Sequence, residues 1–87
     1  MYEIEAILSN ETGIHARPAS MFVKESSKFK SNIKILKEDK VYIAKSILSI
    51  LSMGAVKGDT IKICAEGEDE KEAVEALKQL IDSKFGE

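Results

Sequence analysis

The chain has 87 residues, of which 44% are hydrophobic and 32% charged, so it is long enough for one small domain, residues 1–87, built around one core. Its formal net charge is −2 and it has no lysine-rich run, which argues against nucleic acid as the main partner. The single cysteine can form neither an internal disulfide nor a metal site, and no apolar run is long enough to cross a membrane. We therefore expect a cytoplasmic monomer without cofactor or metal.

The first segment, residues 2–8, alternates apolar and polar residues, which predicts a half-buried strand. Its apolar face comprises Tyr2, Ile4, Ala6 and Leu8. Residues 10–13 contain turn-forming types and end in Thr12-Gly13, so we expect a loop there.

The stretch His15–Pro18 holds the only histidine, the only arginine and the only proline of the chain. It stands between the loop and a helical pattern, so His15 is expected where the helix begins. The first backbone N–H groups of a helix have no partner within the helix, and together with the helix dipole they attract anions. Pro18 suits this first turn, because a proline lacks an N–H that would be unpaired there anyway.

These residue types together point to a histidine that accepts a phosphoryl group. A neutral imidazole such as His15 is a nucleophile, and Arg17 has the planar, permanently charged fork that matches phosphate oxygens. The backbone amides of Ala16 and Arg17 would face the same anion. Taken alone, a histidine at a helix start is more often a simple cap. Because no second acid–base residue stands beside His15, we expect a carrier and not an enzyme that acts on a small molecule.

The helix is predicted from about Ala16 to Ser27, because apolar and small residues recur at spacings of three and four. Its inward stripe comprises Ala16, Ala19, Phe22, Val23 and Ser26. A second stripe, mainly basic, comprises Arg17, Met21, Lys24 and Lys28. Because it begins beside His15, it is a candidate docking strip for acidic partner proteins. An ordinary solvated helix face explains the same pattern.

Residues 32–37 and 40–43 are predicted as two strands joined by the short turn Glu38-Asp39. The favoured Asn-Gly dipeptide is absent from this turn, although aspartate tolerates a left-handed backbone conformation at some cost.

A second, short helix is predicted to begin at Ser46, which can cap it. Five large apolar residues follow within seven positions, more than one face of a short helix can bury. We expect Ile47, Leu48 and Leu51 to be exposed as a partner surface, with Ile50 facing inward. The alternative is a helix buried deeply in the core.

Residues 60–65 form a fourth predicted strand, with Cys64 on the face opposite to Ile61 and Ile63. Residues 69–72 look like a capping box, in which Asp69 caps a helix and Glu72 reaches back. That helix should run to near Lys84, with Phe85 covering its end. Every strand has one apolar face, so the pattern predicts an α+β domain of two layers, a sheet covered on one side.

Two segments resemble the HPr family, the histidine-containing phosphocarrier proteins of the bacterial phosphoenolpyruvate–sugar phosphotransferase system. Residues Gly13–Ala19 resemble the family's active-site signature, and residues Ala44–Gly54 resemble its regulatory serine segment. The resemblance covers essentially the whole chain. It implies an open-faced sandwich, in which three helices cover one face of a four-stranded antiparallel sheet.

The resemblance also implies a function. His15 would accept a phosphoryl group from Enzyme I and pass it to the IIA domains of sugar permeases. Ser46 would be phosphorylated by HPr kinase/phosphorylase for carbon catabolite control, and the phosphoserine form would bind a catabolite-control transcription regulator. Leu48 and Ser49 replace the methionine and glycine that are frequent in the family.

Two alternatives stay open. One is a purely regulatory HPr-like protein that acts through Ser46, although such paralogues lack the histidine. The other is a carrier in a nitrogen-related phosphotransfer chain.

Overall fold

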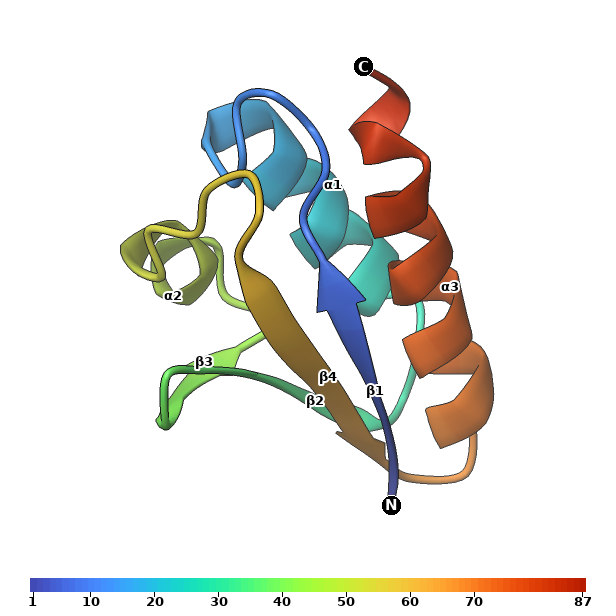
Figure 1. Ribbon diagram of the computed structural model, residues 1–87. Coiled ribbons are helices and arrows are strands. Elements are labelled where there is room, and N and C mark those ends of the chain that lie inside the picture. The colour runs from blue at the N-terminus through green and yellow to red at the C-terminus, as the bar shows by residue number, and fades with distance from the viewer.

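The computed structural model describes residues 1–87 and shows a four-stranded antiparallel sheet with its helices on one face (Figure 1). The strands are β1 (Tyr2–Ile7), β2 (Asn32–Lys37), β3 (Lys40–Ile43) and β4 (Thr60–Glu66). They lie in the order β1-β4-β2-β3, so that β4 pairs with both β1 and β2. The predicted two-layer α+β architecture is confirmed.

Three helices cover the sheet: α1 (Ala16–Ser26), α2 (Ile47–Ser52) and α3 (Glu70–Asp82). A short 3₁₀ turn, η1 (Lys84–Gly86), follows α3. Figure 1 shows α1 and α3 side by side. No helix combines the length and the apolar character that a membrane crossing requires.

The core lies between the sheet and the helices, and it is built from the apolar faces that the alternation predicts. Within the sheet, Ile63 of β4 stands between Ile4 of β1 and Ile35 of β2 in register. The helices close the core with fully buried side chains, which include Phe22, Ile50, Leu77, Ile81 and Phe85. Cys64 lies on the other face of the sheet, as predicted, where its thiol donates a 3.5 Å hydrogen bond to Glu3 Oε2.

The inward face of α1 differs from the prediction at its start. Ala16 is exposed, whereas Pro18 is fully buried together with Ala19. The buried stripe therefore starts in the third position of the helix and continues through Phe22 and Ser26. Because Pro18 is fully buried, this proline anchors the first turn as well as beginning it.

The turn between β2 and β3 has positive φ at both central residues, 52° at Glu38 and 67° at Asp39. This is the requirement of the tight hairpin turns whose twist matches that of the strands they join. The predicted hairpin is confirmed, and its turn adopts the left-handed conformation without glycine.

Asp69 is the N-cap residue of α3, as predicted, but the predicted capping box is wrong. The Asp69 side chain makes no cap bond to its own helix. Its carboxylate instead accepts hydrogen bonds from the backbone N–H groups of Lys30 and Ser31 and from the Ser31 hydroxyl. The loop before β2 offers three donors at once, so the carboxylate binds this loop and not the first turn of α3.

Candidate functional site

The loop before His15 is fixed by Gly13. This residue has φ of +63°, and a Cβ added to it would stand 2.6 Å from the backbone oxygen of Ala55. The next residue, Ile14, donates a 2.9 Å backbone hydrogen bond to that same oxygen. Only glycine combines the left-handed conformation with such a close approach. The segment that follows α2 therefore determines where His15 stands.

His15 is the N-cap residue of α1 and has an extended backbone, with φ of −119°. Its carbonyl oxygen accepts the N–H of Ala19 over 2.8 Å, whereas its side chain makes no cap bond. The imidazole is 46% exposed. The ring is thus held by its backbone at the start of a helix and is open to a partner molecule.

The first turn of α1 provides two amides for an anion. The N–H of Ala19 is used by His15, and Pro18 has none, so the N–H groups of Ala16 and Arg17 are the ones left without a helical partner. No acidic residue occupies this turn. The helix dipole adds positive potential at the same place. The start of α1 can therefore attract an anion beside His15.

Arg17 and Met21 lie one turn apart on α1, as the predicted stripe requires. The Arg17 guanidinium, 52% exposed, donates from Nη1 to the Met21 sulfur over 3.0 Å. Of the two lysines farther along the stripe, Lys24 has no acidic partner, whereas Lys28 forms an ion pair with Glu25 over 3.0 Å. Met21 packs partly against the core, so it is only partly exposed.

Sequence reasoning missed three residues of this site: Asn10, Thr12 and Glu87. The Glu87 carboxylate oxygen Oε2 lies 3.8 Å from His15 Nε2 and 3.5 Å from Arg17 Nη2. It also accepts a 2.8 Å hydrogen bond from the Thr12 hydroxyl, and this bond is the main reason why the pKa of Glu87 is lowered. No spacing signal reveals Glu87, because folding brings it to His15 from the other end of the sequence.

The exposed side chains of α2 match the prediction. Leu48 is 77% exposed, Ile47 39% and Leu51 38%, whereas Ile50 is 1% exposed. We call Ile47, Leu48 and Leu51 the apolar patch. Ala55, just after α2, accepts a backbone hydrogen bond from Ile14, the residue before His15. The apolar patch and His15 therefore belong to neighbouring parts of the surface.

Ser46 is the N-cap of α2, as predicted, and its hydroxyl oxygen accepts the backbone N–H of Ser49 over 3.2 Å. The Ser49 hydroxyl in turn accepts the N–H of Ile43 over 2.7 Å. Ser49, which replaces the family's frequent glycine, thus links α2 to the end of β3 across the loop that contains Ser46.

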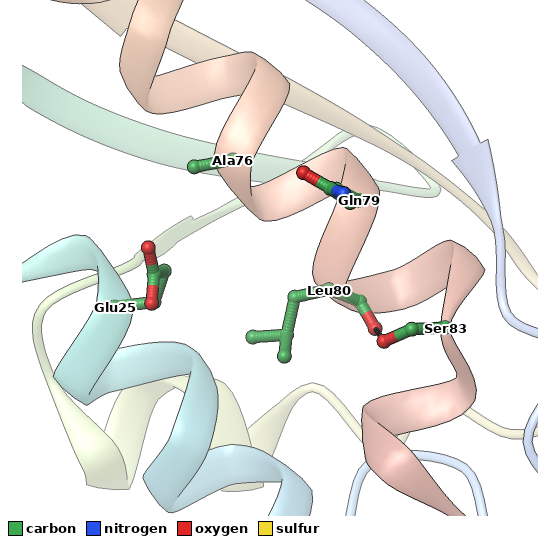
Figure 2. A pocket seen from close by; sticks show the side chains of 5 residues that line it. All are labelled: Glu25, Ala76, Gln79, Leu80 and Ser83. Atoms are coloured by element: carbon green, nitrogen blue, oxygen red, sulfur yellow. Dashed lines mark hydrogen bonds between the residues drawn. The ribbon is translucent and has the colours of Figure 1, made fainter.

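His15 lies outside the hollows of the surface. One of these, about 310 Å³, is an open depression between α1 and α3 whose lining includes Glu25 and Leu80 (Figure 2). No group of three or more histidine, cysteine or acidic side chains is arranged to hold a metal ion. An open position of this kind suits reaction with a group that a partner protein presents.

Comparison with known proteins assigns the family. Residues 2–83 match the family model described as "PTS HPr component phosphorylation site". The phosphocarrier protein HPr of Mycoplasma capricolum is 43% identical over 81 residues, 93% of this chain and 91% of that protein. The HPr-like protein Crh of Halalkalibacterium halodurans is 42% identical and covers 97% of this chain and 100% of its own length.

The fold agrees equally well with solved structures. A crystal structure of HPr from Thermoanaerobacter tengcongensis has a TM-score of 0.97, with 50% identity over 100% of this chain and 98% of the other. A crystal structure of an HPr dimer from the same organism has a TM-score of 0.81 over the full length of both chains. A small open-faced sandwich with a histidine at the start of α1 defines the class of phosphocarrier proteins. The chain belongs to the HPr family of the phosphotransferase system.

Proposed function

We propose that this chain carries a phosphoryl group on His15 from phospho-Enzyme I to the IIA domains of sugar permeases. The observation that carries the proposal is the exposed His15 ring at the start of α1, beside the amides of Ala16 and Arg17 and the Arg17 guanidinium. A nucleophile next to positive potential is what acceptance of a phosphoryl group requires.

The chemical step is an in-line transfer. The Nδ1 lone pair of His15 attacks the phosphorus, a new N–P bond forms, and the bond between phosphorus and its donor on Enzyme I breaks. Charge spreads over the three equatorial oxygens, where the two amides and Arg17 stabilise it. The same groups act in reverse direction when a IIA domain takes the phosphoryl group. Because the site is open and shallow, it does not trap the phosphohistidine.

Partner proteins would dock on the surface around His15. The apolar patch on α2 supplies exposed hydrophobic area, and Met21, Lys24 and Lys28 supply an adaptable thioether and positive charge. Acidic partners such as Enzyme I and the IIA domains fit this combination. We expect a monomer in solution, and light scattering tests this, since a relative forms the HPr dimer described above.

Ser46 is proposed as a regulatory site for HPr kinase/phosphorylase. A phosphate on Ser46 adds roughly −2 charge next to the apolar patch. This charge would weaken docking of acidic partners and create a new surface for a catabolite-control transcription regulator.

A regulatory function without sugar transport is the alternative, and the similarity to the HPr-like protein Crh favours it. His15 favours the carrier, because purely regulatory paralogues of this family lack the histidine. A nitrogen-related phosphotransfer chain would use the same site and differ only in its partners.

Labelling with radioactive phosphoenolpyruvate and Enzyme I tests the proposal. Phosphohistidine is labile in acid and stable in base, whereas phosphoserine behaves in the opposite way. We expect an acid-labile label that is lost in His15→Ala, while circular dichroism shows an unchanged fold. Full labelling of His15→Ala would remove His15 from the mechanism. An acid-stable label at Ser46 alone, formed with ATP and the kinase, would establish the regulatory alternative.

A further inference from the structure

The Glu87 carboxylate is held beside His15 by several groups that converge on one oxygen atom. Glu87 Oε2 accepts hydrogen bonds from Thr12 Oγ1 over 2.8 Å and from Asn10 Nδ2 over 3.3 Å. Arg17 Nη2 lies 3.5 Å from the same oxygen. A side chain with this many partners has a defined position, although Glu87 is part of the surface.

The backbone before Glu87 is equally constrained. Lys84 and Phe85 both have positive φ, 60° and 54°, which is unfavourable for residues other than glycine. The Phe85 side chain is fully buried, and the Glu87 N–H donates to the carbonyl of Lys84 over 2.9 Å. Burial of the Phe85 ring stabilises this left-handed turn, which directs the chain back towards the start of α1.

Asn10 connects this carboxylate to the loop that ends at His15. Its side chain is fully buried, and Nδ2 also donates to the carbonyl of Gly13 over 2.8 Å. Gly13 in turn donates its N–H to the carbonyl of Asn10 over 3.2 Å. The turn from Asn10 to Gly13 therefore fixes Asn10 and Thr12 relative to His15. We call these two residues the clamp, because both donate hydrogen bonds to Glu87 Oε2.

The clamp places a negative charge next to one particular nitrogen of His15. The contact is between Glu87 Oε2 and Nε2, at 3.8 Å. A neutral imidazole carries its proton on one nitrogen and a lone pair on the other, and neighbouring groups decide which. A carboxylate beside Nε2 is attracted to an N–H at this atom and repels a lone pair there.

We infer that Glu87, held by Asn10 and Thr12, is a positioning residue that keeps the neutral His15 ring in the tautomer protonated at Nε2. The lone pair is then on Nδ1, which is the atom that the proposed function uses as nucleophile. The inference rests on the proposed function for the use of this lone pair. The tautomer itself is a property of the unphosphorylated protein.

The test is the ¹⁵N NMR spectrum of the His15 ring in the full-length protein, recorded at a pH where the ring is neutral. Wild-type protein should show a protonated Nε2 and an unprotonated Nδ1. In Glu87→Gln the ratio of the Nδ1–H to the Nε2–H form should rise by about two- to fivefold, the effect of one partly exposed charge. An unchanged ratio in Glu87→Gln would overturn the inference.

Two pairs of variants make the test specific. Thr12→Val removes the hydroxyl donor and should raise the ratio in the same direction, whereas Thr12→Ser keeps the donor and should match wild type. Glu66→Gln removes an equal charge at the end of β4, where it contacts neither His15 nor Arg17, and should leave the ratio unchanged. A ratio that rises in Glu66→Gln as much as in Glu87→Gln would contradict a local effect.

Phosphoryl transfer from Enzyme I separates this inference from the proposed function. We expect Glu87→Gln to lower kcat with little change in KM for Enzyme I, since it changes the reactive form of the ring and not the docking surface. A tautomer shift without any labelling of the wild type would refute the proposed function alone. Normal labelling without a tautomer shift would refute the role of Glu87 alone.

Discussion

The Asp69 carboxylate accepts two hydrogen bonds from Ser31, one from the backbone N–H over 3.0 Å and one from the hydroxyl. A third comes from the N–H of Lys30 over 2.9 Å. These bonds tie the start of α3 to the loop before β2. Gly67 completes the junction, because a Cβ at this position would stand 2.6 Å from the Ser31 hydroxyl oxygen.

The first prediction concerns the pH dependence of stability. The Ser31 hydroxyl, followed by the Lys30 N–H, holds the pKa of Asp69 below its ordinary value near 3.8. A carboxyl whose pKa is lower in the folded state stabilises the protein above its unfolded pKa, and this contribution is lost as the pH falls through the folded pKa. Asp69→Asn should therefore lower the Tm clearly at pH 7 and lower it less at pH 3, because the contribution declines once the pH falls below 3.8.

Thermal unfolding at both pH values measures this difference. Glu72→Gln is the matched control, because Glu72 is exposed in the first turn of the same helix and its side chain makes no hydrogen bond. It should follow the wild-type curve. An equal Tm deficit of Asp69→Asn at pH 7 and at pH 3 would assign the loss to packing and not to the charge.

The sheet and the buried faces could be predicted because they depend on periodicity. A strand of two-residue period can bury only one face, which places Ile61 and Ile63 inside and Cys64 outside whatever the rest of the chain does. Ile50 was also predicted as the inward residue of α2, and it is 1% exposed. The His15–Pro18 segment was predictable for another reason, because its rare residue types are adjacent in sequence.

The polar partners of the site could not be predicted, because they come together only in the folded chain. Local rules assign Asp69 to its own helix, yet three donors of a distant loop bind it more completely. Glu87 reaches His15 through a left-handed turn at Lys84 and Phe85, a conformation that no sequence rule expects of lysine or phenylalanine. In both cases a tertiary contact overrides local preference.

The second prediction concerns the hairpin between β2 and β3. Asp39 has φ of 67°, and its side chain makes no hydrogen bond or ion pair. Glycine adopts this conformation without steric cost, so Asp39→Gly should raise the free energy of unfolding by about 0.5–1 kcal/mol. Urea denaturation measures this change.

The control for the hairpin is Lys40→Gly, one residue further along in β3. Glycine in an extended strand loses backbone entropy without relieving strain, so this variant should be destabilised by about 0.5–1 kcal/mol. A loss of stability in both variants would mean that the turn is not strained at Asp39.

The third prediction concerns the apolar patch. Leu48 is largely exposed, so Leu48→Ser should leave the Tm unchanged. It should raise the KM of Enzyme I for this chain about five- to thirtyfold, which is the effect of losing one central apolar contact. Steady-state phosphorylation at varied concentrations of the chain measures this KM.

Val41→Ser provides the comparison for Leu48. Val41 is 55% exposed but belongs to the edge strand β3 and is not part of the apolar patch. Its KM should equal that of the wild type. A similar rise in KM for both variants would show that exposed apolar area in general, and not the patch on α2, determines docking.

The last prediction concerns Ser46. Ser46→Asp keeps a side chain that can cap α2, because aspartate accepts the N–H of Ser49 as well as serine does. It adds one negative charge beside the apolar patch, so it should slow phosphoryl acceptance from Enzyme I several-fold at low salt, and less at high salt where charges are screened.

The Ser46→Asn variant separates charge from shape, because asparagine has the same shape as aspartate but no charge. Asparagine caps a helix about equally well and is neutral, so this variant should accept the phosphoryl group at the wild-type rate. A rate of Ser46→Asp that is unchanged at low salt would contradict the charge argument. Equal slowing of the aspartate and asparagine variants would instead assign the effect to the size of the side chain at the start of α2.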